Sequence, residues 1–226
     1  MNILNTEKLK VVVFDWDGTL VESRTPRLWA VNQIMKEYGL PDWESTRHLQ
    51  NRTLSFMDNF PNVFGDKAEE AYEKYSLLYK QNVQRMIKVF DGVRETLKLL
   101  KEKNIKIAIM SNKQRALLEY ENPMLFQDDT FDKIVCGHEA KRDKPFKEHA
   151  LLALDGLIDF QNINPQTVWI VGDSILDNMC AIATNTLPVR ILGKAPHPDM
   201  IKNPQDNEKV IYFKSFNDFY LNIDKS

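Results

Sequence analysis

The fold is decided by the stretch Val11-Val12-Val13-Phe14-Asp15-Trp16-Asp17-Gly18-Thr19-Leu20. Its uninterrupted apolar run, 11–14, predicts a strand that is buried on both faces, as strands of parallel sheets are. Asp15 and Asp17 follow at once, at the point where the loops of open α/β sheets bind their ligands. Gly18 permits a tight turn and a close approach of the backbone to a ligand. Two neighbouring carboxylates repel each other unless a cation or a shared proton relieves them, and Mg²⁺ prefers such oxygen ligands.

The same residues also suit an ordinary turn, in which Asp and Gly are dominant residue types. Motifs this short match by chance often enough that the stretch alone leaves a metal site and a plain turn open. The remaining chain has to distinguish the two interpretations.

The composition is that of an ordinary globular protein. The 226 residues are 43% hydrophobic and 27% charged, and this length suits one large domain or two modest ones. The net charge of −2 gives no electrostatic reason to expect a nucleic acid or a membrane surface as partner. We expect no signal peptide in the polar segment 1–10, and no membrane span, since no run approaches about 20 apolar residues. Cys136 and Cys180 allow at most one disulfide, so a reduced, cytoplasmic setting is expected.

The segment after the opening strand shows helical patterns. Apolar residues recur at helical spacing between Leu28 and Tyr38 and again from Ala68 to Ile87, and a less regular pattern predicts a helix over about 43–60. No part of 21–89 shows the alternation of a strand, and the segment is too long for one crossover helix. We therefore expect an all-helical insertion at 21–89, with hinges near 20–23 and 89–92, in a core made of 1–20 and 90–226. Packing rather than a ligand pocket is expected for its aromatic residues, which include Trp29, Tyr38, Trp43 and Phe56.

From Phe90 onward, strands and helices alternate. Strands are predicted over 105–110, 131–136, 167–171, 189–192 and 210–213, and helices over 91–103, up to about 120, over 146–154 and up to about 185. Asn104 and Asn185 suit left-handed helix ends, and Cys180 suits the core. Repeated strand–helix units with short loops predict an α/β fold with a three-layer, Rossmann-like core, a mostly parallel sheet and a small all-helical second domain.

Polar side chains follow four of the predicted strands, at the points where the strands end. They are Asp15 and Asp17, Ser111 and Asn112, Lys144, and Asp173 and Asp177. Because the carboxyl ends of parallel strands share one edge of a sheet, we expect these side chains to meet. Carboxylates, a fixed cation and hydrogen-bond donors are what phosphoryl transfer needs, since its catalysis is mostly positioning and charge neutralisation. The sequence therefore predicts a phosphoryl-transfer site.

Each of these residues also has a structural interpretation. Ser111-Asn112 and Asp173-Ser174 suit helix N-caps, although a helix N-terminus can also bind an anion. Lys144 lies in a basic run, which is usually a solvated surface, and Lys141 is the alternative candidate. We favour Lys144 because Pro145 follows it and suits the first position of a helix.

Four ordered segments resemble the motifs of the haloacid dehalogenase superfamily. They are Phe14-Asp15-Trp16-Asp17-Gly18-Thr19-Leu20, Ser111-Asn112, Lys144-Pro145 and Gly172-Asp173-Ser174-x-x-Asp177. The position of the helical insertion, directly after the first motif, is similar to that in the phosphoglycolate phosphatase-like branch. Two segments depart from the branch: 181–186 lacks its usual Ala-Gly pair, and Lys-Pro-Phe-Lys stands where Lys-Pro-x-Pro is common.

The resemblance implies a role for each carboxylate. Asp15 would be the nucleophile that forms an aspartyl-phosphate, and Asp17 the general acid and base. Mg²⁺ would be bound by Asp15, by the main-chain carbonyl of Asp17 and by Asp173. Asp177 would be either a further ligand or a partner of the ligands.

The resemblance also implies the phosphate-binding groups. Ser111, Asn112 and the main-chain amides after Asp15 would bind phosphate oxygens, and Lys144 would pair with both phosphate and Asp15. The expected activity is Mg²⁺-dependent hydrolysis of a small phosphorylated metabolite. The alternatives are a phosphomutase or a phosphonate hydrolase of the same superfamily, and a non-catalytic phosphate-binding or signalling scaffold. Neither the substrate nor the oligomeric state can be read from the sequence.

Overall fold

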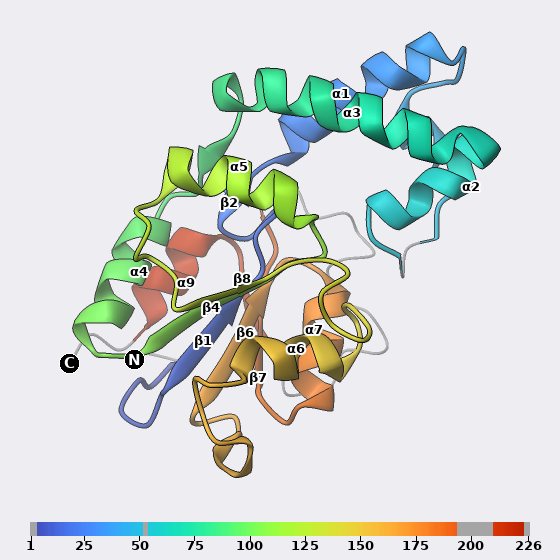
Figure 1. The fold of residues 1–226 in the computed structure, drawn as a ribbon. Coiled ribbons are helices and arrows are strands. Elements are labelled where there is room, and N and C mark those ends of the chain that lie inside the picture. Colours follow the sequence, from blue (N-terminus) through green and yellow to red (C-terminus); the bar gives the residue numbers. More distant parts are fainter. Residues whose placement is uncertain (1–3, 52–53, 194–209, 224–226) are drawn as a thin grey trace.

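The computed structural model describes residues 4–51, 54–193 and 210–223, so residues 1–3 of the segment examined for a signal peptide lie outside it. In the described part, six parallel strands form one sheet in the order β5–β4–β1–β6–β7–β8 (Figure 1). They are β1 (Val11–Phe14), β4 (Lys106–Met110), β5 (Lys133–Val135), β6 (Val168–Gly172), β7 (Leu187–Ile191) and β8 (Ile211–Phe213). The predicted α/β fold with a parallel sheet is confirmed.

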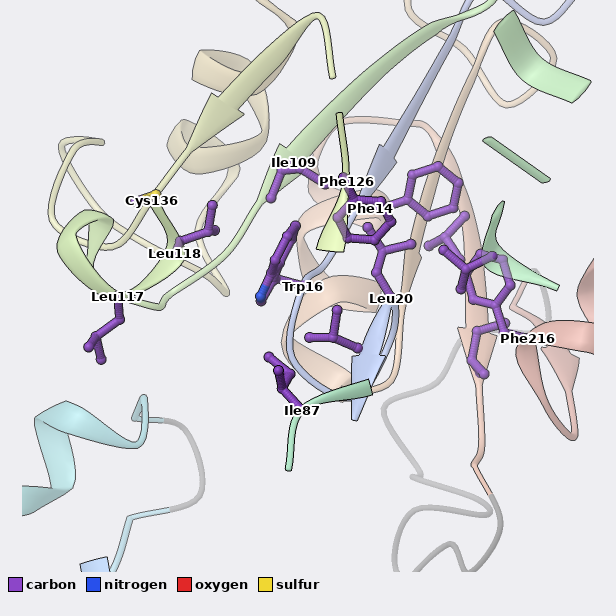
Figure 2. Close-up of a cluster of buried hydrophobic side chains, with 14 of the residues drawn as sticks. Phe14, Trp16, Leu20, Ile87, Ile109, Leu117, Leu118, Phe126, Cys136 and Phe216 are labelled. Atoms are coloured by element: carbon purple, nitrogen blue, oxygen red, sulfur yellow. The ribbon is translucent and has the colours of Figure 1, made fainter. Parts of the chain in front are cut away.

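The first strand divides the core into two sides. Val11 and Val13 belong to a core cluster that includes residues of α6 (Lys147–Leu154) and of α7 (Ile175–Ala183), among them the expected core residue Cys180. Val12 and Phe14 belong to a larger cluster with residues of α4 (Val93–Glu102) and α9 (Phe216–Asn222). Helices therefore cover both faces of the sheet and make three layers (Figure 1). Figure 2 shows Phe14 and Trp16 among the side chains of the larger cluster.

One helix is longer than predicted, and another was not predicted. The helix α5 (Arg115–Leu125) continues past the expected end near 120 and contains Pro123. The helix α9 was not predicted, although Ser215 caps it by accepting a hydrogen bond from the main-chain N–H of Asp218. Asn104 and Asn185 have the predicted left-handed backbone, with φ of 57° and 54°. None of the helices within the described ranges has the length and apolar character that crossing a membrane requires.

The helical insertion contains α1 (Arg24–Glu37), α2 (Phe60–Phe64) and α3 (Ala68–Asn82). The prediction of one helix over 43–60 is wrong, because this segment contains two short 3₁₀ turns, Trp43–Thr46 and Met57–Asn59. The amide of Asn59 bonds to the main chain of Asn51 and Ser55, and such side-chain bonds compete with helix formation. The aromatic residues pack as expected, with the rings of Trp43 and Phe56 4.8 Å apart.

The segments that enter and leave the insertion pair with each other. β2 (Val21–Glu22) and β3 (Lys88–Val89) form an antiparallel ribbon in which Val21 lies opposite Val89. The expectation of an insertion without strands is therefore wrong at its two ends, where two-residue strands are too short to show an alternating pattern. The division into a core of 1–20 and 90–226 and a separate domain of 21–89 stays a prediction.

Candidate active site

The register of the sheet brings three of the motifs to one edge. Phe14, the last residue of β1, lies opposite Ile109 of β4 and Val171 of β6. The main-chain N–H of Asp15 donates to the carbonyl of Val171 at 2.9 Å, which fixes the point where the chain leaves the sheet. Asp15 and the motifs after β4 and β6 therefore meet at the carboxyl ends of three neighbouring strands.

Lys144 comes from the loop after β5 and reaches two of the carboxylates. Its Nζ lies 2.7 Å from Oδ1 of Asp15 and 2.8 Å from Oδ1 of Asp177. All three side chains are buried, whereas Lys141, the alternative candidate, is exposed. The structure therefore brings Lys144 to the carboxylates and leaves Lys141 at the surface.

The main chain of Lys144 is held by two side chains. Asn112 donates through Nδ2 to the carbonyl of Lys144 and accepts through Oδ1 from its N–H, both at 3.1 Å. Nδ1 of the buried His149 accepts from the same N–H at 3.1 Å. The amide of Asn112 is thus engaged with the Lys144 loop. Ser111 is buried beside it, and its Oγ accepts from the main-chain N–H of Lys113 at 3.2 Å, which leaves its own hydrogen to donate.

Three carboxylates form a cluster that can bind a metal ion. Asp15, Asp173 and Asp177 each bring one oxygen within 4.8 Å of the others. Two glycines make this approach possible, because a Cβ on Gly18 would lie 2.2 Å from Oδ2 of Asp173 and one on Gly172 would lie 2.1 Å from Cγ of Asp177. An all-oxygen donor set suits a hard divalent cation. The side chain of Asp17 is not part of the cluster.

The electrostatics of the cluster agree with a cation site. Burial raises the pKa of Asp15 well above its usual value, with Lys144 opposing the rise and Asp177 and Asp173 adding to it. Burial raises the pKa of Asp173 to about 7, and repulsion from Asp177 acts in the same direction. Burial alone would lower the pKa of Lys144, but Asp15 and Asp177 raise it above its usual value. One lysine does not neutralise three carboxylates, so a divalent cation would relieve the remaining repulsion.

Asp177 links Lys144 to the start of α7. Its Oδ2 accepts hydrogen bonds from the main-chain N–H of Ser174 at 3.1 Å and from the Ser174 hydroxyl at 2.6 Å, while Oδ1 accepts from Lys144. The exchange between Ser174 and Asp177 is a capping box of the helix. Both oxygens therefore already have partners, which favours a role for Asp177 in holding Lys144.

Asp17 faces a different set of partners. Its Oδ1 accepts from Lys113 Nζ at 2.7 Å and from the hydroxyl of Ser23. Burial would raise the pKa of Asp17, but the charges of Lys113 and Arg27 and the two hydrogen bonds lower it below its usual value. Lys113 in turn lies 2.6 Å from Oε1 of the buried Glu121.

Lys113 and Glu121 were not among the site residues predicted from the sequence. Lys113 directly follows the Ser111-Asn112 motif, but adjacent residues in a loop can point in different directions. A better signal is Glu121, which lies one helical turn after Leu117 on the buried face of α5. A carboxylate on an apolar face indicates a buried partner of opposite charge.

A cleft of about 270 Å³ lies beside Lys144. Its walls come from Leu54, Ser55 and Asp58 of the insertion and from the loop between His138 and Phe146. Asp58 Oδ1 and His138 Nε2 lie 3.7 Å apart across these two walls. The insertion and the Lys144 loop therefore line the same cleft.

Comparison with known proteins finds a matching family and similar relatives. The haloacid dehalogenase-like hydrolase family matches residues 12–191. The chain is 30% identical over 173 residues to the phosphoglycolate phosphatase of Aquifex aeolicus. The alignment covers 75% of this chain and 78% of the relative. It is also 30% identical over 179 residues to the phosphorylated carbohydrates phosphatase of Thermotoga maritima. That alignment covers 74% of this chain and 77% of the relative.

A solved structure shows the same fold. CbbY from Rhodobacter sphaeroides, determined in complex with phosphate, superposes with a TM-score of 0.75 at 16% sequence identity. The superposition covers 93% of this chain and 96% of that one. The likeness therefore extends over the sheet, its helices and the insertion.

Proposed function

Because the chain belongs to the haloacid dehalogenase-like hydrolase family, and to its phosphoglycolate phosphatase-like branch, we propose that it is a Mg²⁺-dependent phosphatase that forms an aspartyl-phosphate on Asp15. The observation that carries the proposal is the position of Lys144, whose Nζ contacts both Asp15 and Asp177 at the edge of the acidic cluster. A nucleophilic carboxylate, a fixed cation and metal-binding oxygens are then together in one buried place.

The proposed reaction has two steps. In the first, a carboxylate oxygen of Asp15 attacks phosphorus, the bond from phosphorus to the leaving oxygen breaks, and Asp17 gives that oxygen a proton. In the second, Asp17 takes a proton from water, the water oxygen attacks the phosphorus of the aspartyl-phosphate, and inorganic phosphate leaves. Asp15 is regenerated, and Asp17 ends with the proton that the next turnover uses.

The low pKa of Asp17 fits the second step, in which it must be ionised to act as a base. The first step needs the protonated form. The negative charge of a bound phosphate favours it, because a nearby like charge raises the pKa of a carboxyl group.

The remaining groups bind and neutralise. Asp15, Asp173 and the main-chain carbonyl of Asp17 would hold Mg²⁺, which supplies positive charge against the repulsion between phosphate and carboxylates. Ser111 and Lys144 donate to phosphate oxygens. Asn112 supports the same site through the main chain of Lys144, and Asp177 through its contact with Nζ.

A small phosphorylated metabolite is proposed as substrate. Two relatives are named for phosphoglycolate and for phosphorylated carbohydrates.

The experiment measures phosphate release from a panel of phosphate monoesters, with Mg²⁺ and with a chelator. The panel includes phosphoglycolate and several sugar phosphates, and the wild type is compared with Asp15→Asn and with Lys141→Met as a surface control. Mg²⁺-dependent release that Asp15→Asn alone abolishes supports the proposal. A folded protein that binds Mg²⁺ and releases phosphate from no ester would contradict it. Movement of phosphate within a sugar without release would identify a phosphomutase.

A further inference from the structure

The carboxylate of Asp17 is held through one of its two oxygens. Lys113 Nζ and the hydroxyl of Ser23 both donate to Oδ1. Within the described residues, Oδ2 receives no hydrogen bond. Two donors on one oxygen restrict the rotation of the carboxylate and leave the other oxygen available to a substrate.

Lys113 is itself held on three sides. Besides Asp17, its Nζ donates to Oε2 of Glu121 at 2.9 Å, lies 2.6 Å from Oε1 of the same carboxylate, and lies 3.4 Å from the hydroxyl of Tyr79. The Tyr79 ring lies beneath the ammonium group, with its centroid 5.2 Å from Nζ. An ammonium group has three N–H bonds, so each has a partner. The partners come from the loop after β1, from α5 and from α3 of the insertion.

Glu121 is a charged residue in an apolar place. Its side chain is fully buried, and Trp16 donates to its Oε2 through Nε1 at 2.6 Å. Glu121 therefore contacts both Lys113 and the residue next to Asp17. A buried ion pair is weak evidence for stability, because apolar residues of similar volume often stabilise a core as well or better. The pair Lys113–Glu121 thus needs an explanation other than packing.

We propose that Lys113 is a positioning residue that sets the orientation of Asp17, with Glu121 fixing Lys113 in turn. This inference rests on the function proposed above, in which Asp17 is the general acid and base. Lys113 holds Oδ1 and so keeps Oδ2 turned toward the leaving oxygen. The proton moves between Oδ2 and the leaving oxygen in the first step, and between water and Oδ2 in the second. Lys113 neither gives nor takes a proton.

The test uses three variants and a control. Lys113→Met removes the ammonium group at similar length, and Lys113→Arg keeps a cation. The double variant Lys113→Met/Glu121→Gln removes both buried charges and carries the test if the single variant does not fold. The control is Lys98→Met, at an exposed position of α4 whose side chain is 78% accessible.

Two substrates separate positioning of Asp17 from a general effect on the site. The leaving group of p-nitrophenyl phosphate departs without a proton, whereas that of phosphoglycolate needs one. Rapid mixing follows the first step with each. Because general acid catalysis contributes about 10²–10⁴-fold, we expect Lys113→Met to slow the first step with phosphoglycolate about a hundredfold and with p-nitrophenyl phosphate less than about threefold. KM should change little, and Lys113→Arg should restore much of the rate.

Equal losses with the two substrates would overturn the proposal, because Lys113 would then act on the whole site. If the wild type releases phosphate from no ester of the panel, the proposed function fails, and a crystal structure tests the positioning of Asp17 separately. Asp17 turned away from its present orientation in Lys113→Met/Glu121→Gln supports the positioning role. An unchanged Asp17 in that structure overturns it.

Discussion

Lys144 Nζ lies 2.7 Å from Oδ1 of Asp15, although the two residues are 129 positions apart in the chain. Their side chains are only 4% and 8% exposed. The contact depends on the sheet order, because β5, which precedes the Lys144 loop, is separated from β1 by β4 alone. The fold therefore delivers a buried cation to the proposed nucleophile.

Removal of this cation should affect both activity and stability. Lys144→Met would leave the buried carboxylates of Asp15 and Asp177 without their lysine, and breaking a buried pair in this way costs about 3–5 kcal/mol. We expect the free energy of unfolding in a chelator to fall by that order and phosphate release to be lost. Denaturant titration and an activity assay check the two effects. Lys141→Met should change neither the stability nor the activity. Loss of activity in that variant would show that Lys141, and not Lys144, is the active-site lysine.

The stabilisation by Mg²⁺ should depend on pH. The pKa of Asp173 is raised to about 7 by burial and by Asp177. Protonated Asp173 therefore contributes stability that is fully present below the ordinary pKa of an aspartate and is lost as the pH rises through about 7. The loss occurs because the folded protein then releases a proton that the unfolded chain has already released. Mg²⁺ binds the ionised carboxylates, so the rise in melting temperature on adding Mg²⁺ should be larger at about pH 8 than at about pH 6. The assignment of Asp173 as a metal ligand would be contradicted if Mg²⁺ raised the melting temperature equally at the two pH values. It would also be contradicted if Mg²⁺ raised the melting temperature of Asp173→Asn as much as that of the wild type.

Gly18 should be required for the metal site as well as for the turn. It has φ of 82°, and a Cβ there would lie 2.2 Å from Oδ2 of Asp173. Gly39 has a similar φ of 67° but open space around the same position. Gly39→Ala should therefore cost only the backbone strain, about 1–2 kcal/mol, and keep the affinity for Mg²⁺. Gly18→Ala should lose that affinity as well, measured by calorimetry. Equal Mg²⁺ affinities in the two variants would show that Asp173 is not a ligand.

The insertion is expected to change its orientation about the ribbon of β2 and β3. Hinges are predicted near 20–23 and 89–92, where Gly92 has a left-handed backbone at the start of α4. A Cβ on Gly92 would lie 2.8 Å from Cα of Asn217, so this glycine also serves close packing. Crystal structures with and without Mg²⁺ and vanadate would measure the rotation. The same orientation in both would contradict the hinge.

Much of the site follows from local patterns. An apolar run followed by Asp15 and Asp17 marks the end of a buried strand, and the same reasoning applies to Asp173 after β6. Because the strands are parallel, their carboxyl ends lie at one edge of the sheet, so these residues can be predicted to lie together before any side-chain contact is known. The choice of Lys144 over Lys141 depended only on Pro145, and the structure places Lys144 against Asp15. The reason given for it is wrong, because α6 begins at Lys147, with Phe146 as its N-cap, and Pro145 lies before the helix.

The remaining contacts are tertiary and leave weak traces in the sequence. Lys113 and Glu121 meet because α5 lies over the first motif, and nothing in the spacing of eight residues specifies that Asp17 is their third partner. Asn112 resembles a phosphate ligand or a helix cap, but its amide bonds to the loop of Lys144, 32 residues away. The two-residue strands β2 and β3 are likewise formed by pairing rather than by local pattern.

In the proposed reaction Asp15 carries the phosphoryl group, and this phosphorylated form can be trapped. Asp17→Asn should slow the second step but not the first with p-nitrophenyl phosphate, whose leaving group departs without a proton. The phosphorylated protein should therefore accumulate when this variant is mixed with Mg²⁺ and that ester. After an acid quench, digestion and mass spectrometry locate the modification. We predict one phosphoryl group on the peptide that contains Asp15 and none in Asp15→Asn. Phosphate release by the wild type with no such modification, or with the group on another residue, would contradict the account.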